Sequence, residues 1–193
     1  MTRVLIGVKP RICQGDVYRK VEMIERVVES SGDLEISRIT FPLVVVLTQD
    51  CDLEQDHRHR SQREQNGNQD KVIISALVAP LYNIQHVYEG EHLSELNLKM
   101  QLIPRGRTHG RHLRQNQLPR YHFLSFPKKV HIVDSVVDFK HYFSVNIPYL
   151  RSIKKKRFVC RIDKLYREDL SHRFASFLAR IGLPPRADIG DGS

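Results

Sequence analysis

The stretch "TQDCDLEQDHRH" (residues 48–59) crowds carboxylates, imidazoles and one thiol directly after an apolar run. Carboxylate oxygens suit a hard cation, and Mg²⁺ in particular needs only one or two of them beside phosphate oxygens. The competing interpretation is a polar connection over residues 53–70, where solvent-exposed charges are ordinary. We favour the connection and expect neither a metal nor another cofactor. The side chains in question are Asp50, Asp52, Glu54, Asp56, His57 and His59.

Cys51 and Thr48 raise two further chemical possibilities in the same stretch. A Cys51 thiolate beside His57 would be a nucleophile. Its neighbours Asp50 and Asp52 argue against this, because their negative charges raise the pKa of the thiol. Thr48 stands where a strand leaves the core, a position that suits either the capping of a turn or contact with a ligand. Both roles stay open.

Positive charge is concentrated in the second half of the chain. The formal net charge is +9, yet residues 1–100 contain 12 Lys and Arg against 15 Asp and Glu, whereas residues 101–193 contain 19 against 7. Such a charge distribution attracts polyanions, nucleic acid first. A solvated surface and an acidic protein partner are the alternatives.

Two stretches without acidic residues carry this charge, one between Glu95 and Asp134 and one between Asp138 and Asp163. The first contains "PRGRTHGRHLRQNQLPRYHF", which mixes arginine with polar side chains that bond phosphates and ends in aromatic residues that stack on bases. It predicts a flexible loop that binds polyanions. The second contains "RSIKKKR", which predicts a cationic turn before a strand. The predicted nucleic-acid-binding residues are Arg105, Arg107, Arg111, Arg114, Arg120, Lys154, Lys155 and Lys156.

Most of the elements that must position these residues are predicted to be strands. Alternating or continuous β-branched runs indicate strands at residues 34–48, 71–80 and 156–162, and two more within 128–145 that break near Asp134 and Ser135. Residues 16–28 fit either a helix or a strand, and we favour a strand because "SSGD" after them is a good hairpin turn.

One amphipathic helix is predicted at about residues 163–182. Its apolar side chains recur at helical spacing and favour core packing, with a dimer contact as the alternative. Asp163 can cap the start and Gly182 the end. The tail, residues 183–193, has nothing to bury and is expected to be flexible. The apolar positions are Leu170, Phe174, Phe177, Leu178 and Ile181.

The pattern as a whole predicts a mainly β (α+β) chain of one domain over residues 1–193, with a core at about 15–162. Three widely spaced cysteines offer neither a disulfide framework nor a zinc pair, which favours the reducing cytoplasm. The apolar stretch at the N-terminus is about five residues long, too short for a signal peptide or a membrane span. We therefore expect a cytoplasmic protein without membrane contact.

The order of several motifs resembles the opening of the PemK/MazF-like toxins over about residues 15–81. The motifs are "GDVY", Arg38 ahead of "FPLVVVL", Thr48, and "KVIISALVAPL". The resemblance implies a small SH3-like curved sheet or barrel that binds RNA. Active members cleave RNA without a metal, through attack of the ribose 2′-hydroxyl on the adjacent phosphate. It also implies that Arg38 stabilises a phosphate and that Thr48 places a hydroxyl near the substrate.

Three functions are compatible with the sequence. The first is a nucleic-acid-binding protein of PemK/MazF type, with RNA favoured, that is an endoribonuclease if it is catalytic. The second is a non-enzymatic interaction subunit of a bacterial defence or toxin–antitoxin complex, with a protein partner or a second copy of the chain. The third is a metal-dependent nuclease that uses residues 50–59. Cleavage that survives a chelator favours the first, and cleavage that a chelator abolishes favours the third.

Overall fold

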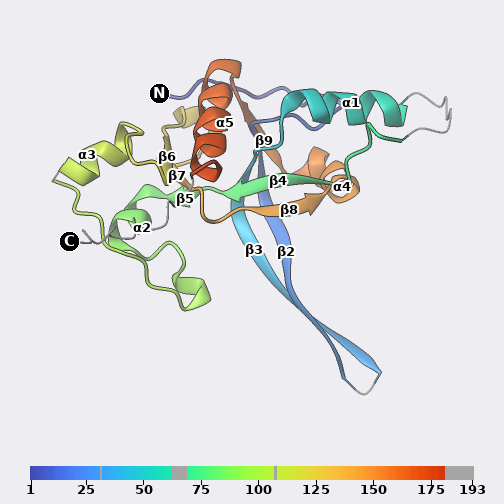
Figure 1. Ribbon diagram of the computed structural model, residues 1–193, viewed down its shortest axis with the longest axis horizontal. Coiled ribbons are helices and arrows are strands. Elements are labelled where there is room, and N and C mark those ends of the chain that lie inside the picture. Colours follow the sequence, from blue (N-terminus) through green and yellow to red (C-terminus); the bar gives the residue numbers. More distant parts are fainter. Residues whose placement is uncertain (31, 62–68, 107, 181–193) are drawn as a thin grey trace, which may run out of the picture.

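A six-stranded antiparallel sheet forms the centre of the molecule (Figure 1). The computed structural model describes residues 1–30, 32–61, 69–106 and 108–180. The strand order is β1-β9-β2-β3-β4-β8, and β1 and β8 have one neighbour each among the described strands, so the sheet is open rather than a closed barrel. The strands are β1 (Val4–Leu5), β2 (Asp16–Ser30), β3 (Asp33–Val46), β4 (Ser75–Pro80), β8 (Phe143–Asn146) and β9 (Phe158–Ile162).

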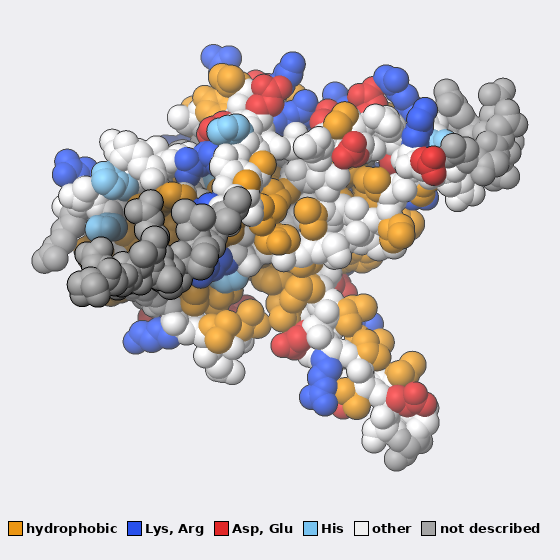
Figure 2. Space-filling view, in the orientation of Figure 1, with side chains coloured by type: hydrophobic (Ala, Val, Ile, Leu, Met, Phe, Trp, Pro, Cys, Tyr) orange, Lys and Arg blue, Asp and Glu red, His pale blue; other side chains and the backbone are white. Residues whose placement is uncertain are grey.

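β2 and β3 form one long hairpin, which confirms the strand favoured for residues 16–28. At the inner end Val17 lies opposite Val45 and both are fully buried. The outer part, residues 24–30 and 32–38, leaves the body of the molecule as an arm, and hydrophobic side chains lie on its surface (Figure 2). The exposed apolar residues of the arm are Ile24, Val27, Leu34 and Ile36.

β3 and β4 correspond to the strands predicted at residues 34–48 and 71–80, and they are adjacent and antiparallel. Their connection differs from the prediction, because it contains the helix α1 (Asp50–Ser61) instead of a polar loop. Acidic residues in its first turn and basic residues in its last turn complement the helix dipole. Leu53 is its only described buried apolar side chain, so the sequence of this segment has no apolar stripe from which the helix could be predicted.

Two more helices replace predicted irregular segments. The predicted polyanion-binding loop contains α3 (Thr108–Arg114), and the predicted cationic turn is the last part of α4 (Ile147–Arg157). Asn146 caps α4 by accepting a hydrogen bond from the N–H of Tyr149. Arg107 lies outside the described residues. The remaining short elements are α2 (Ile84–Glu89) and the 3₁₀ helices η1 (Ser94–Leu96) and η2 (Lys128–Val130).

The predicted C-terminal helix is present as α5 (Lys164–Leu178), and Asp163 caps it by accepting a hydrogen bond from the N–H of Lys164. Phe174 and Phe177 are buried as expected. Leu178 is 47% exposed, so its predicted burial is wrong. Residues 181–193, which include the predicted end of the helix and the tail, lie outside the described residues.

The two faces of the large sheet carry separate cores, because side chains alternate along each strand. Val17 and Val45 pack with α5 on one face, while Tyr18 and Val44 pack with α1 and α4 on the other. A third core joins α2 and α3 to a smaller sheet of order β5-β7-β6. The smaller sheet consists of β5 (Tyr82–Asn83), β6 (Tyr121–Leu124) and β7 (Ser135–Asp138).

The smaller sheet corrects the prediction for residues 128–145. The two strands in this range, β7 and β8, are short and are separated by residues 139–142 instead of breaking near Asp134. They belong to different sheets, so the chain crosses from one sheet to the other between them. No described helix combines the length and apolar character that a membrane crossing requires.

Candidate nucleic-acid interface

The two residues that the resemblance assigns to catalysis are far apart. Arg38 lies on the arm, where 55% of its side chain is exposed and its Nη1 lies 3.5 Å from Oε2 of Glu22. Thr48 follows β3, and its hydroxyl accepts a 2.7 Å hydrogen bond from the N–H of Leu77. The strand from Arg38 to Val46 spans about 26 Å at about 3.3 Å per residue. The structure therefore does not bring the two side chains into one site.

Asp16, the acidic residue of "GDVY", is fully buried and contacts two cations. Nε of Arg161 donates a 2.6 Å hydrogen bond to Oδ1, and Nζ of Lys154 lies 3.4 Å from Oδ2. The hydroxyl of Tyr18 donates a 3.2 Å hydrogen bond to the same Oδ2. Burial lowers the pKa of Lys154, although Asp16 opposes this effect. With 5% of its side chain exposed, Lys154 links α4 to β2 and does not face solvent as a phosphate-binding residue would.

The arginines of the predicted binding loop are largely paired with carboxylates that lie elsewhere in the sequence. Arg105 forms an ion pair with Glu89, and Nη1 of Arg114 lies 3.1 Å from Oδ2 of Asp134. Arg111 is exposed and has no ion pair with a described residue. Despite the absence of nearby acidic residues in the sequence, Arg105 and Arg114 are therefore paired within the fold, and among these described arginines Arg111 alone stays unpaired.

Three of the four acidic residues at positions 50–59, Asp50, Glu54 and Asp56, pair with arginines. Oδ1 and Oδ2 of Asp50 accept hydrogen bonds of 2.9 Å from Arg11, and Nη1 of Arg167 lies 3.2 Å from Oδ2. Burial opposes ionisation, but these two guanidinium groups hold the pKa of Asp50 below its usual range. Asp56 is buried and pairs at 2.7 Å with the arginine one turn later. Cys51 is exposed and free at the start of α1.

Unpaired positive charge lies on the outer side of α4. At 100° per residue, Arg151, Lys155 and Lys156 fall on one side of the helix and Lys154 on the other. All three are exposed, and none forms an ion pair with a described residue. On the opposite side Leu150 and its buried neighbours pack against the sheet. Helix geometry thus separates the structural lysine from the solvent-facing cations.

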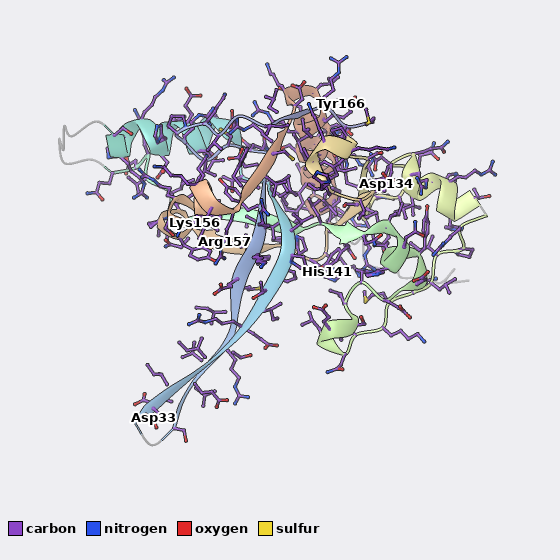
Figure 3. All side chains as sticks on the ribbon, turned by 180° about the vertical axis from the view of Figure 1, so that it is seen from behind. Asp33, Asp134, His141, Lys156, Arg157 and Tyr166 are labelled. Atoms are coloured by element: carbon purple, nitrogen blue, oxygen red, sulfur yellow. The ribbon has the colours of Figure 1, made fainter. Side chains whose placement is uncertain are left out.

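β2 extends this cationic surface. The guanidinium of Arg157 donates a hydrogen bond to the carbonyl of Lys20, which joins the end of α4 to β2 (Figure 3). Arg19 and Lys20 are exposed and also lack an ion pair with a described residue. We call this surface the α4 face, and it consists of Arg19, Lys20, Arg151, Lys155 and Lys156. The sequence prediction included Lys155 and Lys156 and missed the other three, although a helical projection of residues 147–157 would have found Arg151.

Asp138 is the partner of Arg120 and is itself fully buried. Nε of Arg120 donates a 2.8 Å hydrogen bond to Oδ1, so this predicted phosphate contact is also occupied within the protein. His92 and His141 approach the same carboxylate. In the described part of the chain these three residues form the one group of histidine, cysteine or acidic side chains with the spacing of metal ligands.

Comparison with known proteins adds no relative. No family model, no curated protein and no solved structure matches the chain.

Proposed function

We propose that this protein binds nucleic acid, with RNA favoured, through the α4 face. The observation that carries the proposal is that three exposed cations of one helix side have no carboxylate partner in the described part of the chain. Lys155 and Lys156 present flexible point charges, and Arg151 adds a planar donor that pairs with a phosphate. Because no intramolecular ion pair must break, phosphates can bind without losing existing contacts.

The resemblance to the PemK/MazF-like toxins suggests an SH3-like arrangement of β2, β3 and β4. These strands form a curved antiparallel part of the open sheet and contain the motifs that carry the likeness. An SH3-like arrangement of this part would fit an RNA-binding ancestry. Arg38 and Thr48 do not share a site, so we propose binding rather than cleavage as the activity.

Salt-dependent binding tests the proposal. The triple variant Arg151→Gln, Lys155→Gln, Lys156→Gln should flatten the slope of log K against log salt for single-stranded RNA by roughly 2–3 units, at about 0.7–0.9 per phosphate contact. Fluorescence anisotropy with labelled RNA and single-stranded DNA over a salt series measures both slopes.

The matched control removes three exposed lysines from distant parts of the fold. Lys99→Gln, Lys128→Gln, Lys129→Gln changes the net charge equally and leaves the α4 face intact. An equal effect of both triple variants would mean that only net charge acts, and the proposed interface would be wrong. The same conclusion follows if the wild-type protein fails to bind either nucleic acid at low salt.

A second candidate function is self-association through the arm, in keeping with an interaction subunit. Its support is the apolar surface of the arm, which includes Val27 and Ile36 at one paired position. Exposed apolar surface of this kind marks association sites. Analytical ultracentrifugation should show a dimer for the wild-type protein and a monomer for Val27→Ser, Ile36→Ser, and a monomeric wild-type protein excludes this candidate.

A further inference from the structure

Three metal-ligating side chains meet beneath the end of β7. Asp138 is the last residue of this strand, and its carboxylate is fully buried. His141 follows in a turn in which its N–H donates a 2.9 Å hydrogen bond to the carbonyl of Asp138. His92 comes from the segment between α2 and η1, and 1% of its side chain is exposed. Figure 3 labels His141 on the side of the molecule that carries α2.

The distances in this cluster suit coordination better than direct hydrogen bonding. Nε2 of His92 and Nδ1 of His141 lie 3.6 Å and 3.4 Å from Oδ2 of Asp138. An N–H···O hydrogen bond spans about 2.7–3.2 Å. Ligands at about 2.1 Å from a tetrahedral zinc ion lie about 3.4 Å from one another. All three ligand atoms fall within 4.8 Å of one another.

Unsatisfied polar atoms gather at the same place. Both ring nitrogens of His92, Nδ1 of His141 and the hydroxyl of Tyr82 are buried without a hydrogen-bond partner among the described residues. A buried donor or acceptor without a partner destabilises a fold by about 1–3 kcal/mol. Tyr82 packs edge-on against His92, with ring centroids 4.9 Å apart. A cation shared by the imidazoles and the carboxylate would satisfy the ligand nitrogens together.

Surrounding groups fix the carboxylate that would bind the ion. Oδ1 of Asp138 accepts hydrogen bonds from Nε of Arg120 and from the N–H of Lys140, at 2.8 Å and 3.1 Å, and Nη2 of Arg120 donates a hydrogen bond to Oδ2, the oxygen nearest the two histidines. Outer-shell contacts of this kind orient the ligands of metal sites. The aspartate is therefore presented as an oriented carboxylate.

We propose that His92, Asp138 and His141 bind a divalent transition-metal ion of the zinc class. Two imidazoles and one carboxylate form a donor set that suits Zn²⁺, Co²⁺ or Fe²⁺ better than Mg²⁺ or Ca²⁺. Three protein ligands leave a further coordination position. A groove of about 290 Å³, lined by His92, Tyr82 and apolar side chains of β3 such as Phe41, adjoins the cluster. The site is independent of the α4 face.

Titration with the metal alone tests the site. Tag-free protein, freed of metal by a chelator, is titrated with Co²⁺ by visible absorption and then with Zn²⁺ in competition. We expect one ion per chain. His92→Gln and His141→Gln should each lower the affinity by roughly a hundredfold or more, since loss of an outer-shell contact alone lowers it about 10–100-fold. His172→Gln, at an exposed position of α5, should leave the affinity unchanged.

Two measurements keep the test decisive. Circular dichroism of the metal-free variants establishes that they fold. His141→Gln should disturb the fold less than His92→Gln, because His141 is the less buried histidine. X-ray absorption of the zinc-loaded wild-type protein should show imidazole ligands at about 2.0–2.1 Å. A wild-type protein that binds no Co²⁺ or Zn²⁺ at millimolar concentration overturns the proposal. So do folded His92→Gln and His141→Gln variants that bind the metal as tightly as the wild-type protein does.

Discussion

Acid sensitivity at His122 follows directly from its surroundings in β6. The side chain is 2% exposed, and Nδ1 has no hydrogen-bond partner among the described residues. Phe139 packs near the ring, and Arg173 of α5 adds a positive charge nearby. Burial, with a smaller contribution from Arg173, lowers the pKa of His122 to about 3.

The sign and size of the effect can be worked out from this shift. In the unfolded chain a histidine has a pKa of about 6.5, so between pH 6.5 and 3 only the unfolded state binds the proton. The free energy of unfolding therefore falls as the pH falls through this range, by about 1.4 kcal/mol per pH unit. Between pH 7 and pH 5 His122 should account for a loss of about 2 kcal/mol.

Urea unfolding of wild-type protein and His122→Leu at pH 7 and pH 5 measures this contribution. The loss of stability on acidification should be about 2 kcal/mol smaller in the variant, whatever its stability at pH 7. The control variant His109→Leu, at an exposed position, should lose as much free energy of unfolding between pH 7 and pH 5 as the wild-type protein does. If wild-type protein and His122→Leu lose the same free energy between the two pH values, His122 is not held neutral by burial and the reasoning fails.

Four substitutions test the core, one turn and the buried charges by chemical unfolding. Phe174→Ala should lower the free energy of unfolding by about 3–5 kcal/mol, whereas Leu178→Ala, at a position 47% exposed, should cost less than about 1 kcal/mol, and equal losses would contradict the burial. Gly90→Ala places a Cβ 2.3 Å from the carbonyl oxygen of Met100 at φ +72°, so a loss of about 1–3 kcal/mol is expected and an unchanged midpoint would refute the strain. Asp16→Asn leaves two buried cations without a countercharge and should cost about 3–5 kcal/mol, so a variant as stable as the wild-type protein would show that the pairs are dispensable.

Four strands of the large sheet, β2, β3, β4 and β9, could be predicted because their side chains alternate or form β-branched runs. The strong pattern of residues 34–48 and 71–80 corresponds to β3 and β4. The spacing of Leu170, Phe174 and Phe177 likewise predicted α5. In each case the buried side chains belong to one continuous segment, so their spacing in the sequence is sufficient to predict the strand or helix.

The helices α1 and α4 were not predicted from the sequence, α1 because it has almost no apolar period and α4 because its apolar period is short and runs into a series of cations. α1 buries a single described apolar residue, Leu53, and α4 ends in a run of cations of which only Lys154 turns inward. The candidate sites were harder to predict than the helices, because ion pairs between residues far apart in the sequence decide which cations stay unpaired. Lys154 pairs with Asp16, which lies 138 positions earlier in the chain, and no local sequence pattern predicts such a partner.

The separation of the arm from every core divides the stability of the chain into two parts. Among the described strands, β9 pairs with β2 only at residues 16–18 and β4 pairs with β3 only at residues 44–46, so in the arm each strand of the hairpin pairs only with the other. An isolated two-stranded ribbon is marginally stable in water. The arm can therefore open while the body stays folded, and its amide hydrogens should exchange at rates set by this local opening rather than by global unfolding.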